Sequence, residues 1–436
     1  MEQKRVMVDM SATLIHHGHI RLLRKASKYG LVIVGLTIDE EIQSKKGYKP
    51  ELTYDERKEI LESIKYVSEV VPTPWLLDQE VLDKYEIDLL IHGHDNSNLI
   101  DKNKLKIFPR TEGVSSLEIR QRAQKAITSI NNNKLMLTPG PAVVLHENLE
   151  YLKPLFGRGD DEYTTMYRAV IQWLKKLSGQ DQVVMAQGSS TFALELAAHS
   201  FVKGKVLLIS TGYYSERLKQ LLPKNCEVVV CQYEELNEVK DKFDWVLCAY
   251  TETSIAFKVD LNVIKSKANS LGAKLYVDAT GSIGLEDDHE LADAMAFSSC
   301  KGLFGLTGAC FIAYKKNIEP RNSDLFYFNL HTQKNKMVTG PYHAIASLYG
   351  VMAQHSLFKS RVKKSKNSIL EKWHNIVRDS NQPLLCTYLE GKVKAIDDNV
   401  VLYSPRSDLT GSVICHFGEI HSDQVNLVNK INIEVC

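Results

Sequence analysis

Two histidines near the amino terminus have a spacing suited to phosphate chemistry. His16 and His19 flank Gly18 in a His-His-Gly-His motif, which follows a short apolar run and precedes an amphipathic stretch. The N-terminus of a helix favours a polyphosphate, and two imidazoles there can donate to one phosphate as negative charge builds during transfer. Gly18 permits a close backbone approach. Taken alone, these two histidines could instead be surface or packing residues.

A second segment, residues 109–120, carries groups that match a triphosphate. Ser115 and Ser116 place hydroxyls at an expected helix start, and Arg110 and Arg120 place guanidinium groups at either end. Guanidinium forks and hydroxyls are common partners of phosphate oxygens. Lys46, or its neighbour at position 45, lies in a polar loop placed to close over the same phosphates.

In the second half of the chain, an acid and a lysine each close a strand-like run. Asp278 ends the run 274–278, and Lys301 comes 23 residues later, at the end of another run. In a parallel sheet both ends open into one crevice. Such a pair suits pyridoxal phosphate (PLP), because the acid keeps the ring nitrogen protonated and the lysine binds the aldehyde. A salt-bridged pair at the sheet edge is the alternative.

Further residues are consistent with a PLP site. Residues 187–195 place Ser190 and Thr191 at an expected helix start, where backbone amides and hydroxyls can form a phosphate cup. An ordinary helix cap is the alternative. Tyr214 offers an aromatic face for the cofactor ring, and Thr253 follows a strand-like run.

Apolar periodicity predicts the elements that position these groups. Strand-like and amphipathic runs alternate through residues 1–125, which predicts a parallel sheet with helices on both faces. The polar stretch 129–134 predicts turns and a boundary. We therefore expect a first domain over 1–128, a linker over 129–134 and a second α/β domain over 135–436, with a large lobe to about residue 345 and a small lobe after it.

The composition argues against several classes of protein. The 436 residues include 54 basic and 53 acidic residues, and the formal charge of +1 comes without a basic block that would indicate nucleic acid. No apolar run approaches the roughly 18 residues of a membrane helix. All eight cysteines lie in the second half without a C-x-x-C pair. These features, with no signal peptide recognised, predict a reduced cytoplasmic protein.

Over about residues 4–125 the chain resembles cytidylyltransferases of the glycerol-3-phosphate type. The shared features are the H-x-G-H motif, the Tyr54–Lys58 helix, the Lys65–Pro72 stretch, a Gly93–Asp95 turn and the Arg110–Arg120 segment. The resemblance implies that a phosphate or phosphonate oxygen attacks the α-phosphorus of CTP with Mg²⁺ assisting, although the H-x-G-H chemistry alone also serves ATP. The catalytic groups would be His16 and His19, and the CTP-binding residues Gly18, Lys46, Asp95, Arg110, Ser115, Ser116 and Arg120. One departure is Thr13, where the family has an aspartate; it leaves the acceptor and metal site open.

Over about residues 135–436 the chain resembles class V, fold-type I aminotransferases, especially the 2-aminoethylphosphonate:pyruvate transaminase family. The opening Leu137–Pro141 and the residues named above follow that pattern. The resemblance implies that Lys301 binds PLP, that Asp278 pairs with its ring nitrogen and that Tyr214 stacks on the ring, with Thr253 in the same site. The cofactor phosphate would be held by Ser189, Ser190, Thr191, Ser299 and Thr339 of the partner subunit, which implies a homodimer.

A departure in this half concerns the substrate. Val413 stands where the family has an arginine that grips the anionic end of the substrate. Arg406 or His416 could replace it, the amino-acid donor could differ, or the domain could decarboxylate. The expected fold is thus α/β, with a Rossmann-like nucleotidyltransferase domain followed by a fold-type I PLP-dependent transferase domain.

Three functions follow from the two halves together. The first is a bifunctional enzyme that makes or consumes a small aminophosphonate such as 2-aminoethylphosphonate and couples it to CMP. The second is the same pair of activities acting on an amino-alcohol phosphate. The third is a transferase carried on an idle dimerisation scaffold, although an idle domain has no chemical reason to keep both Lys301 and Asp278.

Overall fold

The computed structural model describes residues 3–94, 97–109, 111–130, 134–153, 155–157, 159–335, 338–378 and 381–434, with the backbone alone over 124–130. The chain divides into two compact units, residues 1–131 and 132–436.

The first unit is built on a parallel sheet of five strands in the order β3-β2-β1-β4-β5. Apolar runs form the strands β1 (Arg5–Met10), β2 (Leu31–Thr37), β3 (Glu69–Thr73), β4 (Leu89–Gly93) and β5 (Leu105–Phe108). The helices between or after them are α1 (His17–Ala26), α2 (Asp39–Lys46), α3 (Tyr54–Glu62), α4 (Gln79–Lys84) and α5 (Ser116–Ile130). The order reverses between β1 and β4, and such a switch point opens a crevice at the carboxyl ends of the strands.

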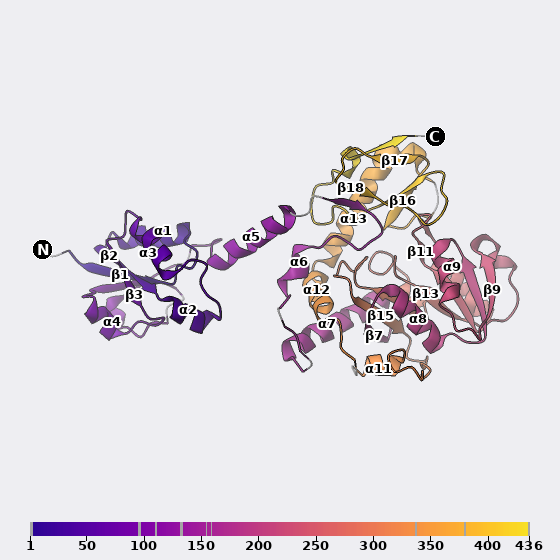
Figure 1. Cartoon of the computed structure of the whole chain (residues 1–436), viewed down its shortest axis with the longest axis horizontal. Helices are drawn as coiled ribbons and strands as arrows, with labels where there is room; N and C mark the ends of the chain where they lie inside the picture. Colours follow the sequence, from indigo (N-terminus) through magenta and orange to yellow (C-terminus); the bar gives the residue numbers. More distant parts are fainter. Residues whose placement is uncertain are drawn as a thin grey trace. The chain divides into compact units, whose positions relative to one another are not determined.

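Helices cover both faces of this sheet (Figure 1). Val6 and Val8 of β1 join a core with α1 and α3, whereas Met7 joins a second core with α4. Because successive side chains of a strand point to opposite faces, this alternation places apolar cores on both sides of the sheet.

The second unit contains a sheet of seven strands in the order β7-β15-β14-β13-β10-β8-β9. Its strands are β7 (Gln182–Gln187), β8 (Lys205–Ser210), β9 (Glu227–Gln232), β10 (Trp245–Ala249), β13 (Lys274–Asp278), β14 (Ala294–Ser298) and β15 (Ala309–Tyr314). Only β15 runs antiparallel to its neighbours within this sheet. The carboxyl ends of the other strands therefore lie along one edge.

Two apolar layers cover this larger sheet. One contains residues of α7 (Asp161–Ser178), α10 (Leu261–Ser270), α12 (Tyr342–Met352) and α13 (His355–Trp373). The opposite layer contains residues of α8 (Ser190–Phe201) and α9 (Tyr213–Gln220). Short helices α6 (His146–Glu150) and α11 (Leu330–Lys334) and the hairpin of β11 (Thr251–Glu252) and β12 (Phe257–Lys258) complete this lobe.

The small lobe gathers short strands around its own core. They are β16 (Cys386–Leu389), β17 (Lys392–Ala395), β18 (Val400–Leu402), β19 (Ser412–Cys415) and β20 (Ile431–Glu434). They are joined by β6 (Leu135–Leu137), which pairs in parallel with β18. Leu137 packs with Ile369 and Ile414 in this core, so the first residues of the unit complete a lobe formed mainly by the last ones.

Two local features differ from the sequence-based expectation. Helix α5 continues to Ile130, so the first two residues of the expected linker are helical; the three asparagines after them lie outside the described residues. Strand β14 ends at Ser298, and Lys301 follows in a turn rather than ending the strand itself. The described helices include none that is both long and apolar enough to cross a membrane.

Candidate functional sites

A pocket of about 650 Å³ opens at the carboxyl ends of β1 and β4, where the strand order reverses. Residues from β1, α1, β4 and α5 line it, and they include His16, His19, Ser115 and Arg120. The sequence predicted that these residues share a site. The tertiary structure brings them together at the switch point of the sheet.

His16 and His19 form a reciprocal cap at the start of α1. Nδ1 of His16 accepts from the Gly18 N–H at 3.2 Å, and Nδ1 of His19 accepts from the His16 N–H at 3.3 Å. The ring centroids lie 3.9 Å apart. A neutral ring that accepts at Nδ1 carries its proton on Nε2. Both imidazoles line the pocket.

The small size of Gly18 and the lowered pKa of His19 both favour this arrangement of the two imidazoles. A Cβ atom at Gly18 would lie 2.9 Å from Nδ1 of His16 and 3.3 Å from Val114, so a side chain there would displace the imidazole. Burial, with smaller contributions from the neighbouring His16 and Lys46, lowers the pKa of His19 to about 3. His19 is therefore neutral near pH 7 and acts as a hydrogen-bond donor without a net charge.

The serines and Arg120 lie at the start of α5. Ser115 Oγ caps the helix by accepting from the Glu118 N–H at 3.1 Å. Arg120 pairs with the Glu51 carboxylate, and its Nη2 also donates to Thr13 Oγ1 at 3.1 Å. The guanidinium of Arg120 lowers the pKa of Glu51. A phosphate that binds Arg120 has to compete with this carboxylate.

Lys46 approaches the pocket from the end of α2. Its Nζ donates to Ser11 Oγ at 3.0 Å and lies 5.4 Å from the Trp75 ring centroid. This contact places Lys46 beside the loop that leads from β1 to the histidines. Arg110 and Asp95, which the sequence also predicted for this site, lie outside the described residues.

The structure adds an acid that the sequence reasoning missed. Asp9, near the end of β1, has a side chain only 11% exposed, and Oδ2 lies 3.4 Å from Nε2 of His92 on β4. Asn98 also donates to this oxygen, at 2.9 Å. All three residues line the same pocket, as does Trp75. A signal was present in the sequence, because an aspartate at the end of an apolar parallel strand faces the crevice.

Arg57 on α3 supports the pocket from below. Its side chain is fully buried. It donates to the backbone carbonyls of Ser11 and Thr37 and pairs with Asp39. These hydrogen bonds fix the backbone at the ends of β1 and β2, and therefore the segment that leads to the histidine motif. The sequence reasoning noted the Tyr54–Lys58 helix without giving this arginine a role.

A second group of chemical residues lies along the carboxyl edge of the larger sheet. Asp278 ends β13 and is 5% exposed, and one of its carboxylate oxygens accepts from the Thr280 N–H at 2.9 Å. Lys301 lies in the turn after β14, and its Nζ is 5.9 Å from the Tyr214 ring centroid. A Cβ at Gly140 would lie 3.0 Å from the Lys301 side chain, so the Leu137–Pro141 segment passes directly over this lysine.

Glu252, for which the sequence predicted no role, positions Tyr214. Its fully buried carboxylate accepts from the backbone N–H groups of Tyr214 and Ser215, and also from the Ser254 hydroxyl. Burial raises the pKa of Glu252, whereas these hydrogen bonds oppose the shift. A carboxylate at the N-terminus of α9 is also favoured by the helix dipole. Glu252 thus holds the start of α9, and Tyr214 with it, against the segment that carries Thr253.

The residues predicted to form a phosphate cup lie at the start of α8. Ser189 is its N-cap, and Ser190 and Thr191 begin the helix directly after β7. Three hydroxyls along the same sheet edge are buried without a hydrogen-bond partner among the described residues; they belong to Thr211, Thr251 and Thr280. Buried unpaired hydroxyls are uncommon in native proteins, so this edge has spare capacity for a polar ligand.

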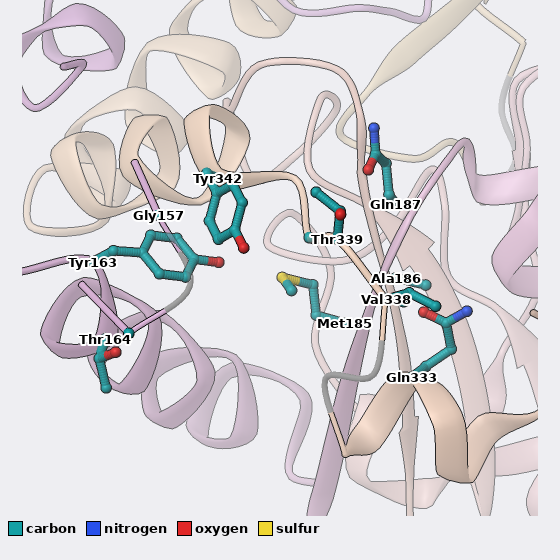
Figure 2. Close-up of a pocket in the computed structure, with 12 residues that line it drawn as sticks. Gly157, Tyr163, Thr164, Met185, Ala186, Gln187, Gln333, Val338, Thr339 and Tyr342 are labelled. Carbon is teal, nitrogen blue, oxygen red and sulfur yellow. The ribbon is translucent and has the colours of Figure 1, made fainter. Parts of the chain in front are cut away.

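Ser299 and Thr339 were also predicted to hold the cofactor phosphate. Ser299 is fully buried, and its hydroxyl is directed at the backbone carbonyls of Leu306 and Ala309, which stabilises the turn carrying Lys301. Thr339 lines a separate cavity of about 70 Å³. In Figure 2 the hydroxyl groups of Tyr163 and Tyr342 point towards Met185 and the Thr339 loop. The roles of Ser299 and Thr339 in phosphate binding stay predictions.

The described residues contain no group of three or more histidine, cysteine, aspartate or glutamate side chains arranged to hold a metal ion.

The larger unit has the fold of aminotransferases. Alanine–glyoxylate aminotransferase from Nostoc sp. superimposes with a TM-score of 0.56 at 18% identity, and the match covers 66% of this chain and 91% of that protein. This likeness confirms the expected fold of the C-terminal region.

The smaller unit has recognisable relatives in sequence. Residues 13–122 match the family model described as cytidylyltransferase-like. Glycerol-3-phosphate cytidylyltransferase of Staphylococcus aureus is 39% identical over 126 residues, which are 27% of this chain and 93% of that protein. Ethanolamine-phosphate cytidylyltransferase of Mus musculus is 35% identical over 127 residues, which are 26% of this chain and 31% of that protein. Through its N-terminal domain, this chain therefore belongs to the cytidylyltransferase-like family.

Proposed function

We propose that the N-terminal domain transfers the cytidylyl group of CTP to a small acceptor that carries a phosphonate or phosphate at one end and an ammonium group at the other. The relatives' names support the reaction class, since both act on phosphate esters of small alcohols. 2-Aminoethylphosphonate is the acceptor that best fits both halves of the chain.

In this reaction an acceptor oxygen attacks the α-phosphorus of CTP. The bond from the α-phosphorus to the oxygen bridging to the β-phosphorus breaks, and pyrophosphate leaves. His16 and His19 donate from Nε2 to the phosphoryl oxygens as charge develops, and Gly18 lets the backbone approach them. We propose that the triphosphate, with Mg²⁺, is bound by Lys46, Ser115, Ser116 and Arg120. The resemblance adds Arg110 and Asp95 to this set.

The observation that carries the choice of acceptor is Asp9. This carboxylate lies in the histidine pocket with Trp75 as a second lining residue. A carboxylate and an indole face are the groups that bind an ammonium ion in a partly buried site. Glycerol 3-phosphate has no such group to offer, whereas 2-aminoethylphosphonate and ethanolamine phosphate both have one.

For the C-terminal domain we propose PLP-dependent amino-group transfer. The unpaired threonine hydroxyls, the cap of α8, Asp278 and Lys301 lie on one sheet edge, and this donor set fits the phosphate, ring nitrogen and aldehyde of PLP. When bound, PLP supplies an electron sink. Lys301 holds the cofactor and moves protons at Nζ, Asp278 keeps the ring nitrogen protonated, and Tyr214 lies against the ring, positioned by Glu252.

We further propose that the C-terminal domain forms a homodimer and that the two domains act on the same aminophosphonate. Ser189, Ser190, Thr191, Thr253 and Ser299, with Thr339 of the partner subunit, complete the cofactor site in a homodimer. An amino acid exchanges its amino group there, so that the domain forms or consumes the aminophosphonate that the N-terminal domain activates. An amino-alcohol phosphate as the acceptor is the second candidate, which the mouse relative favours.

The deciding experiment incubates the full chain with Mg²⁺ and CTP. Parallel reactions contain 2-aminoethylphosphonate, ethanolamine phosphate, phosphocholine or glycerol 3-phosphate, and one series replaces CTP with ATP. Pyrophosphate release and ³¹P NMR report the product. A new phosphonate–phosphate anhydride formed only with the phosphonate supports the first candidate. Turnover of ethanolamine phosphate with an inert phosphonate selects the second, and a preference for glycerol 3-phosphate refutes the argument from Asp9.

A further inference from the structure

An amino-acid substrate of the proposed amino-group transfer carries an anionic end, and Val413 offers it no charge. Val413 is 3% exposed and packs in the core of the large lobe. His416 is fully buried, its Nε2 lies 2.9 Å from Thr387 Oγ1, and burial lowers its pKa to about 3. Near pH 7 His416 is therefore neutral and closed off from a ligand.

The described part of the small lobe contains three arginines. Arg361 is paired with Asp423 and donates to the Ile420 carbonyl. Arg378 stacks on Tyr388, with its guanidinium carbon 3.6 Å from the ring centroid. Arg406, in the loop after β18, donates instead to Tyr213, at the start of α9.

Two aromatic rings connect Arg406 with Lys301. Nη1 of Arg406 donates to the Tyr213 hydroxyl at 3.1 Å. The Tyr213 and Tyr214 rings meet edge to face with centroids 5.2 Å apart, and Nζ of Lys301 lies 5.9 Å from the Tyr214 centroid. Among the described residues no carboxylate forms a salt bridge with Arg406, and its side chain is exposed.

We propose that Arg406 is the specificity residue that binds the distal anionic group of the aminotransferase substrate, a carboxylate or a phosphonate. This inference rests on the proposed function of the C-terminal domain. The planar guanidinium fork matches two oxygens of either group, and the remaining donors of Arg406 are available while Nη1 stays on Tyr213. The small lobe thus supplies from a loop the charge that the resembling family supplies from the β19 position.

The test measures anion binding, which is distinct from turnover. Propionate and ethylphosphonate lack an amino group, and calorimetry gives the dissociation constant of the PLP-supplemented full chain for each. We expect Arg406→Gln to weaken binding of the preferred anion about 10- to 100-fold, with partial recovery in Arg406→Lys. The two anions together tell whether the site takes a carboxylate, a phosphonate or both.

Arg378→Gln is the matched control, because it removes the competing guanidinium of the same lobe. It should leave both dissociation constants unchanged. In the amino-group transfer assay Arg406→Gln should raise KM for anionic amino donors much more than it lowers kcat, while ethylamine is unaffected. Wild-type anion binding in Arg406→Gln, or a loss confined to Arg378→Gln, overturns the inference. Failure of the proposed function would appear separately, as a chain that takes up no PLP.

Discussion

Nη2 of Arg120 lies 3.1 Å from Oγ1 of Thr13, and the same guanidinium holds the carboxylate of Glu51. Arg120 is therefore held beside the segment that leads to the histidine motif. We expect Arg120→Gln to raise KM for CTP about 10- to 100-fold, because a charge-assisted hydrogen bond to a phosphate is lost. Glu51→Gln should not raise it, since this change releases the guanidinium. Steady-state kinetics checks both variants, and equal increases in both would mean that the pair acts as a structural unit.

The role of Asp9 in acceptor choice is tested by Asp9→Asn, which keeps the shape and removes the charge. KM for the ammonium-bearing acceptor should rise at least about 10-fold, because a charged partner is lost. KM for CTP should change little. Asp55→Asn, on the exposed side of α3, is the matched control. Equal loss for acceptor and CTP would contradict a specific contact with the ammonium group.

Arg57 is expected to be a large contributor to the stability of the N-terminal domain. Arg57→Gln removes the guanidinium from Asp39 and from three backbone carbonyls. Arg57 is fully buried but the Asp39 side chain is 33% exposed, so the expected cost is about 1–3 kcal/mol. Hydrogen–deuterium exchange of peptides from β1 and β2 across a urea titration measures the change in this domain. Arg24→Gln, on the exposed face of α1, should lie within about 0.5 kcal/mol of wild type. A loss below about 1 kcal/mol in Arg57→Gln would show that the network is dispensable.

Lys301 should be the attachment point of PLP. After incubation with PLP and reduction with borohydride, mass spectrometry of peptides should find the modification on Lys301 in wild type and no PLP retained by Lys301→Ala. Lys316→Ala, at an exposed position two residues beyond β15, should label as wild type does. Because the cytidylyltransferase site lies in the other domain, pyrophosphate release should persist in Lys301→Ala. Labelling at another lysine would refute the assignment.

Acid should destabilise the C-terminal domain through His416. Its pKa is lowered to about 3 by burial, so between pH 6.5 and 3 the unfolded chain binds a proton that the folded chain does not. Stability is therefore full above about pH 6.5 and falls by about 1.4 kcal/mol for each pH unit below it. His416→Gln should reduce the slope of the unfolding free energy against pH by about that amount. An unchanged slope would mean that the imidazole is not kept neutral in the folded state.

The sequence by itself determined the chemistry-bearing motifs and the two α/β folds. His16, Gly18, His19 and the Ser115–Arg120 segment are close in the chain or follow strand ends. Local periodicity and helix-start signals therefore sufficed to predict a common site. The same holds for Asp278 and Lys301, because residues after parallel strands meet at one edge.

Only the tertiary structure decided which distant side chains complete these sites. Asp9 meets His92 and Asn98 across 83 and 89 residues of chain, Glu252 reaches the start of α9, and Arg406 reaches Tyr213 across 193 residues. Strand order and loop path bring these pairs together, and neither is encoded in local periodicity. The burial of a side chain also depends on the tertiary structure. His19 and His416 are neutral because atoms from many parts of the chain surround them and lower their pKa.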